Sequence, residues 1–116
     1  MTENLLKQER EHLDALLKLT PFIFHESKPT PGATQLRALA GWRFTTANQT
    51  AEADIYVFDT YERIQAAIGE LITIHASKRD NQPMVSQNGP LVFVVHRLNN
   101  SNDGQILAQA LAGEEE

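Results

Sequence analysis

The stretch that decides the fold is DIYVFDTYERIQAAIGELITIHASKR, residues 54–79, because it joins a strand pattern directly to a helix pattern. Its first five residues are mainly β-branched or aromatic, which favours a strand. Asp59, with Glu62 three residues later, forms an aspartate version of the capping box that opens a helix. One face of that helix carries Tyr61, Ile64, Ile68, Leu71, Ile72 and His75. This spacing predicts a helix that packs on the sheet to which residues 54–58 belong.

The chain before this unit predicts a first helix and more strands. Residues 2–19 carry leucines at helical spacing, and Pro21 makes the preceding residue a poor helical one, so a helix is expected to end there. Residues 22–24 form a short apolar run typical of a brief strand. Residues 36–45 alternate as a half-buried strand does, although residues 36–40 also suit a helical turn.

The chain after it predicts a hairpin and a short helix. Met84 and Val85 are expected to pair with residues 91–98. Within that strand, Leu91–Val95 is apolar on both faces, as an interior strand covered from two sides would be. Residues 105–111 predict a helix that ends at Gly113. The fold class is therefore α+β: a small mixed or antiparallel sheet of three to five strands, packed by two longer helices and a short C-terminal one.

Composition predicts one globular domain over residues 1–113, followed by an acidic, solvated tail at residues 114–116. The 116 residues are 41% hydrophobic and 22% charged, which is ordinary globular usage. The absence of cysteine excludes thiolate zinc sites and fits a reducing compartment. The longest fully apolar run, Leu91–Val95, is far shorter than the roughly 20 residues of a membrane helix. We therefore expect a cytoplasmic protein with no membrane partner.

The net charge of −5 argues against a nucleic-acid partner, because such proteins usually present a basic patch. The one feature in favour is a pair of arginines, Arg37 and Arg43, which share a strand face if residues 36–45 form one strand. Alternation places Trp42 on the opposite side of that strand, where it would be in the core. A solvated basic face is the simpler interpretation of the two arginines.

The histidines predict neither a metal site nor a cofactor. None of the four has a second histidine or a carboxylate pair at ligand spacing. The most suggestive pair is Glu9 with His12, because both lie within the leucine face of the first helix. An acid–base pair is one interpretation. The structural alternatives are an ion pair from Glu9 to Arg37 or Arg43, or a first helical turn that projects beyond the core.

These observations favour a non-catalytic protein-binding domain, such as a self-associating subunit, an adaptor or an inhibitor. The alternatives are a nucleic-acid-associated regulator that uses the arginine face, and a small enzyme or ligand binder that uses histidine and carboxylate groups. The residues expected to contact a protein partner are Leu6, Glu9, Leu13, Leu17, Arg37 and Arg43.

The first helix supplies the argument for self-association. Its leucines form a wide apolar face that must be buried. Either the helix covers the second face of its own sheet, or it pairs with the same helix of another copy across a two-fold axis. The sequence slightly favours the second arrangement, which makes a homo-oligomer the expected assembly.

Overall fold

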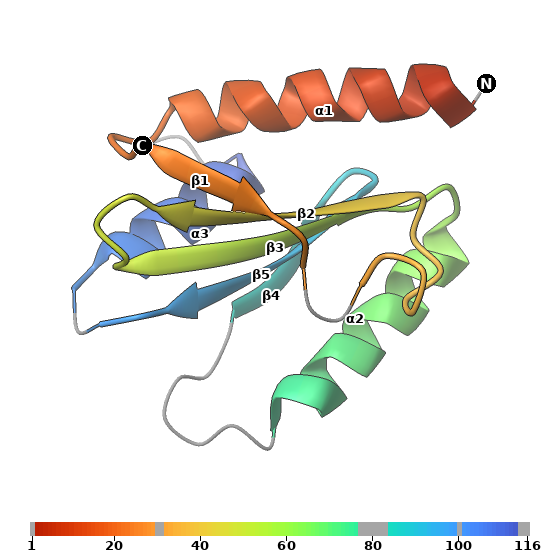
Figure 1. Cartoon of the computed structure of the whole chain (residues 1–116). Helices are drawn as coiled ribbons and strands as arrows, with labels where there is room; N and C mark the ends of the chain where they lie inside the picture. The colour runs from red at the N-terminus through yellow and green to blue at the C-terminus, as the bar shows by residue number, and fades with distance from the viewer. Residues whose placement is uncertain (1, 30–31, 77–83, 100, 114–116) are drawn as a thin grey trace.

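The chain folds into one five-stranded sheet with helices on both faces (Figure 1). The computed structural model describes residues 2–29, 32–76, 84–99 and 101–113. Within them the elements are α1 (Thr2–Lys18), β1 (Phe24–Ser27), β2 (Ala40–Thr46), β3 (Ala51–Val57), α2 (Tyr61–Ala76), β4 (Met84–Asn88), β5 (Leu91–Arg97) and α3 (Asp103–Ala112). The α+β class is confirmed. The expected acidic tail at 114–116 lies outside the described residues.

Every pair of neighbouring strands is antiparallel, and the order across the sheet is β1-β2-β3-β5-β4. The predicted hairpin is confirmed, because Asn88 pairs with Leu91 and Met84 with Val95. Strand β5 lies inside the sheet, and all five residues of its apolar run are at most 1% exposed. A strand covered on both faces has no polar side to present, which explains its composition.

Helices α1 and α3 cover one face of the sheet, and α1 lies along the top in Figure 1. Leu13, Leu16 and Leu17 of α1 and Leu107 and Leu111 of α3 are buried there. The strands contribute Phe44, Ala51, Ala53, Ile55, Val57, Leu91, Phe93 and Val95 to this core. The apolar face of the first helix is therefore buried inside its own chain. This is the first of the two arrangements that the sequence allowed.

Helix α2 covers the opposite face, as its periodicity predicted (Figure 1). Two members of its predicted packing face, Tyr61 and Ile72, are instead exposed, at 68% and 53%. Ile64, Ala67 and Leu71 pack there against Tyr56, Phe58, Leu36, Val92 and Val94. Thr60, and not Asp59, caps this helix, because its Oγ1 accepts a hydrogen bond of 3.2 Å from the N–H of Arg63. The prediction that Asp59 caps this helix is therefore wrong by one residue. A side chain reaches the third helical N–H only from the residue directly before the helix.

Two strand boundaries differ from the sequence prediction. Residues 22–24 were expected to form a strand, but β1 begins at Phe24 and extends through Ser27. The strand expected over residues 36–45 begins only at Ala40 and runs to Thr46. Residues 33–37 form a turn instead, and only Leu36 and Arg37 of the alternative helical turn over residues 36–40 belong to it. In consequence Leu36 packs under α2, while Phe44 packs under α1.

The turn before β2 ends like a helix and holds Arg37 in a left-handed conformation. The N–H of Ala38 donates to the carbonyl of Ala33 over 2.9 Å, and the N–H of Arg37 donates to Thr34 over 3.2 Å. This pair of bonds is the Schellman pattern, in which the left-handed position usually belongs to glycine. Here Arg37 occupies that position with φ of 60°. Arg37 therefore carries a long side chain at a backbone position that favours glycine.

Replacing Arg37 with glycine is expected to raise the free energy of unfolding by up to about 1 kcal/mol, because glycine adopts positive φ without steric cost. The matched control is Gln35→Gly in the same turn, whose φ is not positive. It should lose about 0.5–1 kcal/mol through the added freedom of the unfolded chain. Urea melts of both variants test this. An equal loss in both would contradict the left-handed conformation of Arg37.

Candidate functional site

Most of the residues expected to contact a partner are used inside the chain. Leu13 and Leu17 are in the core under α1, and Leu6 is half-buried and packs against the same core. Glu9 keeps only 14% of its side chain exposed, and its Oε1 lies 3.4 Å from Nδ1 of His12. The structure thus brings Glu9 and His12 together, at a distance longer than a good hydrogen bond. Its expected alternative partners, Arg37 and Arg43, are not within ion-pair distance.

Arg37 and Arg43 do not share a strand face, so the arginine surface expected from the sequence does not form. Arg37 lies in the turn before β2. Arg43 lies in β2, and its guanidinium holds Asp54 with two hydrogen bonds of 2.7 and 3.1 Å. The Glu52 carboxylate lies 3.3 Å from the same guanidinium. Because two carboxylates neutralise Arg43, it offers little attraction to a phosphate backbone.

Arg43, Glu52, Asp54 and His96 form an ionic cluster on the face of the sheet that α2 partly covers. The strand register brings these side chains together. Arg43 is paired with Asp54 across β2 and β3, and Glu52 is paired with His96 across β3 and β5. Paired residues point to the same face, so all four side chains converge. Asp54 is 1% exposed, and its Oδ2 lies 3.8 Å from Nε2 of His96. The cluster is the most buried group of charges in the described part of the chain.

Asp54 is ionised at neutral pH. Burial alone would raise the pKa of its carboxyl group, but the His96 imidazole and the Arg43 guanidinium outweigh burial and hold that pKa below its usual value. Burial and the charge of Asp54 raise the pKa of the neighbouring Tyr56, which therefore stays protonated. A carboxylate with a bidentate arginine is well suited to joining strands, whereas a general base needs a free oxygen directed at a substrate.

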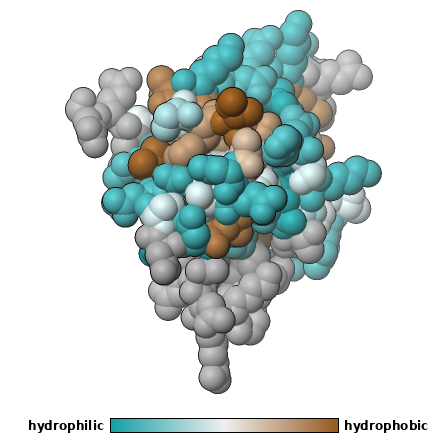
Figure 2. Space-filling view, turned by 60° about the vertical axis from the view of Figure 1, so that its left-hand side comes forward, coloured by the Kyte–Doolittle hydropathy of each residue, from teal (hydrophilic) through white to brown (hydrophobic). Residues whose placement is uncertain are grey.

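Among the described residues, four of the six large hydrophobic side chains that are exposed lie at one end of the sheet, which we call the apolar end. They are Leu19 (68% exposed), Ile23 (75%), Leu98 (42%) and Ile106 (39%). Backbone hydrogen bonds join this end together: the Ala47 N–H donates to Ile23, and the Leu98 N–H donates to Thr50. Figure 2 brings this side forward and shows brown apolar side chains gathered among the teal polar ones.

The turn at the centre of the apolar end is held by hydrogen bonds to one threonine hydroxyl. Thr46 Oγ1 accepts hydrogen bonds from the N–H groups of Thr50 and Ala51, at 2.9 and 3.1 Å. The described residues that meet here include no charged side chain: LTPFIF at 19–24, ANQTA at 47–51, LN at 98–99 and SN at 101–102. Their lack of charge was readable from the sequence. The sequence did not predict that these segments lie side by side, because that depends on the order of the strands.

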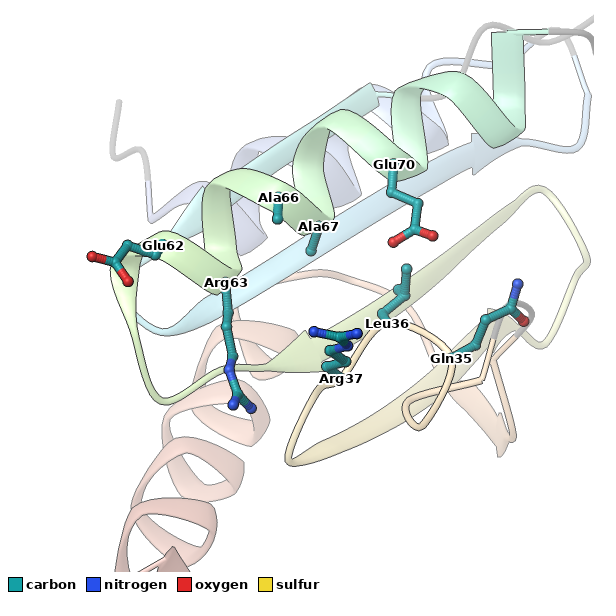
Figure 3. Close-up of a pocket in the computed structure, with 8 residues that line it drawn as sticks. All are labelled: Gln35, Leu36, Arg37, Glu62, Arg63, Ala66, Ala67 and Glu70. Atoms are coloured by element: carbon teal, nitrogen blue, oxygen red, sulfur yellow. The ribbon is translucent and has the colours of Figure 1, made fainter.

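A separate pocket of about 380 Å³ lies between the 33–38 turn and α2 (Figure 3). Its lining combines two arginines with two glutamates over a small apolar floor: Gln35, Leu36, Arg37, Glu62, Arg63, Ala66, Ala67 and Glu70. Figure 3 shows the Arg37 guanidinium between Arg63 and Glu70, whereas Glu62 points away. The sequence prediction missed this pocket because it placed Arg37 in a strand.

No protein-family model, no curated protein and no solved structure matches this chain. Among the described residues, no three histidine or acidic side chains are grouped so that they could hold a metal ion. Nor does any helix in those residues combine the length and the apolar character that crossing a bilayer requires. The arrangement of its own residues is therefore the basis for assigning a function.

Proposed function

We propose that this chain is a non-catalytic protein-binding domain that associates with a second copy of itself through the apolar end. The observation that carries the proposal is the exposure of Leu19, Ile23, Leu98 and Ile106 at one end of the sheet. Large apolar groups collected on one surface and surrounded by polar ones are typical of an interaction site. The expected interaction through Leu6, Leu13 and Leu17 is replaced by this surface, because those side chains pack in the core of the chain.

The charge distribution indicates where two copies could meet. The chain carries a net charge of −5, so two copies repel each other over most of their surface. The segments 19–24, 47–51 and 98–102 carry no charge, so this is where two copies can approach without repulsion. Interface centres are depleted of charged residues for the same reason.

The alternative functions have less support. A nucleic-acid regulator would need free basic groups, whereas Arg43 is paired with Asp54 and Glu52. An enzyme that used Asp54 and His96 would need a carboxylate oxygen open to a substrate, whereas both oxygens of Asp54 accept from Arg43. The absence of cysteine fits a reducing compartment, and on that ground we place the protein in the cytoplasm.

Cross-linking of single-cysteine variants tests the proposed surface, since the natural chain has no cysteine to interfere. Ala47→Cys places a thiol in the exposed turn of the apolar end, and Gln65→Cys places one on the exposed side of α2. With a short bismaleimide at micromolar protein, we expect dimers of Ala47→Cys to form about ten times faster than dimers of Gln65→Cys, because binding raises the effective concentration.

A second substitution separates binding from simple thiol exposure. Ile23→Ser in the Ala47→Cys background removes the most exposed apolar side chain and should slow cross-linking to the rate of Gln65→Cys. Equal rates for the two single-cysteine variants would contradict association through the apolar end.

A further inference from the structure

We propose that the outer edge of β4 binds an extended segment of another protein, which adds a sixth strand to the sheet. The segment runs antiparallel to β4, carries apolar side chains at alternate positions and has a basic residue at its N-terminal end. Tyr61, Ile68 and Ile72 of α2 contact the apolar side chains, and Asp59 attracts the basic one. This surface is distinct from the apolar end, and it does not depend on self-association.

Strand β4 has a free edge, because it is the last strand of the sheet and among the described residues it pairs only with β5. The turn before β5 shows which backbone groups face outward. The carbonyl of Pro90 accepts from the N–H of Phe58 over 3.0 Å, so Pro90 directs its backbone toward β3. The residue after it therefore directs its backbone toward Asn88, its partner in β4. Because this direction alternates along a strand, Val85 and Gln87 direct their N–H and C=O groups away from the sheet.

The two edges of the sheet differ in their protection. Strand β1 has only four residues, lies between Pro21 and Pro29, and carries Glu26, which forms an ion pair with Arg10. Short length, charges and prolines are the features by which natural sheets prevent an edge from pairing with another chain. The five residues of β4, MVSQN, contain neither a charge nor a proline. The β4 edge is therefore the one suited to strand addition.

Helix α2 presents an uncharged side next to this edge. Four residues at spacings i, i+4, i+7 and i+11 form it: Tyr61, Gln65, Ile68 and Ile72. Tyr61 also lines a hollow of about 370 Å³ together with Gln87 of β4, which places this side of the helix toward the edge strand. The pocket beside the 33–38 turn is lined mainly by the other side of the helix (Figure 3).

Two apolar side chains on this side of α2 are exposed. Tyr61 is 68% exposed and Ile72 is 53% exposed, and among the described residues they are the two large hydrophobic groups exposed outside the apolar end. Ile68 of α2 and Val85 of β4 pack at the margin of the core under the helix. In an added strand every second side chain points to the face that α2 covers. These exposed groups are therefore placed to contact alternate apolar residues of such a strand.

The charges at one end of the edge set the direction of the segment. Strand β4 runs from Met84 to Asn88, so an antiparallel strand begins beside Asn88. The Asn88 side chain donates to the carbonyl of Leu111 over 3.0 Å, and the last turn of α3 has no basic residue to balance its negative end. Asp59, 43% exposed, lines the hollow at this same end with Gly89. A basic residue at the start of the segment is attracted by both.

These charges favour another protein over a second copy of this chain as the occupant. Two β4 strands paired antiparallel bring no basic residue to Asp59, because MVSQN contains none. The net charge of −5 also repels a second copy and attracts a basic segment. The β4 edge therefore fits a basic, extended segment from a different protein.

Titration of the isotope-labelled protein with the peptide acetyl-Lys-Thr-Val-Thr-Ile-Thr-amide, followed by two-dimensional NMR, tests the proposal. We expect the amide signals of residues 61–72 and 84–88 to shift. At saturation the amide protons of Val85 and Gln87 should exchange with solvent about ten times more slowly, because they then donate to the peptide. Replacing the lysine of the peptide with glutamate should weaken binding several-fold.

Two N-methylated peptides separate strand pairing from simple apolar contact. One is methylated on the nitrogens of its valine and isoleucine, and the other on the nitrogens of its first two threonines. Only one edge of an added strand faces β4, so one peptide should bind about tenfold more weakly, because it loses hydrogen bonds, and the other should bind as the parent does. Equal weakening of both would contradict pairing along β4.

Two pairs of variants locate the segment. Gln87→Pro removes an outward N–H that the sheet does not use and should weaken peptide binding about tenfold, whereas Gln87→Thr keeps the N–H and should have no effect. Ile72→Ser should also weaken binding, and Ile106→Ser at the apolar end should not. The proposal is wrong if the peptide shifts none of these signals or if Gln87→Pro binds as well as Gln87→Thr. Slow exchange of Val85 and Gln87 without peptide that quickens on dilution would assign the edge to a second copy and would also contradict it.

Discussion

Replacing Arg43 with methionine is expected to lower the free energy of unfolding by about 3–5 kcal/mol at pH 7. The reason is that Asp54, at 1% exposure, would keep a buried negative charge without its bidentate partner. Methionine retains the length and apolar stem of the side chain, so most of the loss would come from the charge. Urea melts of both proteins measure the difference.

The same pair predicts how stability depends on pH. The folded-state pKa of Asp54 is below its usual value, so its contribution is present above the unfolded pKa and is lost as pH falls through the folded pKa. The cost of Arg43→Met should therefore shrink in acid, where a protonated Asp54 no longer needs the guanidinium.

A double variant provides the control for this prediction. Arg43→Met with Asp54→Val removes both charges and should recover most of the stability, because an apolar pair of similar volume replaces a buried ion pair at little cost. A loss below about 0.5 kcal/mol for the single variant, typical of an exposed pair, would mean that Asp54 is solvated.

The second large effect concerns the two faces of the sheet. Leu13→Ala under α1 and Leu71→Ala under α2 should each cost about 2–5 kcal/mol, since both side chains are fully buried. Because α1 packs on its own sheet, the cost of Leu13→Ala should be the same at low and high protein concentration. Thermal or urea melts over a hundredfold range of concentration measure this.

A cost of Leu13→Ala that rises or falls with concentration would mean that α1 is shared between copies. Leu71→Ala is the matched control, because its surroundings are Tyr56, Phe58 and Val94 from the same chain in either arrangement. Its cost should not vary with concentration.

Elements with a strong local pattern were predictable from the sequence. The face of α2 that carries Ile64 and Leu71 repeats at helical spacing, and the structure places both residues in the core. The two-sided apolar run Leu91–Val95 correctly indicated a strand covered on both faces. In these cases burial and local propensity favour the same secondary structure.

Boundaries were predicted less well where two patterns overlap. Residues 36–40 alternate as a strand does, yet Leu36 packs under α2 after a turn that ends with Arg37 in a left-handed conformation. An arginine at a position that favours glycine gives no sign of a turn in the sequence. The cap of α2 was misplaced by one residue because Asp59 and Thr60 are adjacent and both suit that role.

The candidate sites were predictable only in part. The leucines of the first helix were recognised as a face that needs covering, but the sequence did not show that α3 would complete the core beside it. The apolar end brings together residues 19–24, 47–51, 98–99 and 101–102, which are far apart in the chain. Only the strand order β1-β2-β3-β5-β4 makes them neighbours.

The solution mass of the protein, measured by light scattering across micromolar concentrations, tests the proposed self-association most directly. We expect the mass to rise from that of one chain, 13.0 kDa, toward that of two. Leu19→Ser with Ile23→Ser should keep the protein monomeric, whereas Tyr61→Ser with Ile72→Ser, which removes comparably exposed side chains from α2, should not. A wild-type mass of one chain at every concentration, or equal effects of the two double variants, would contradict association through the apolar end.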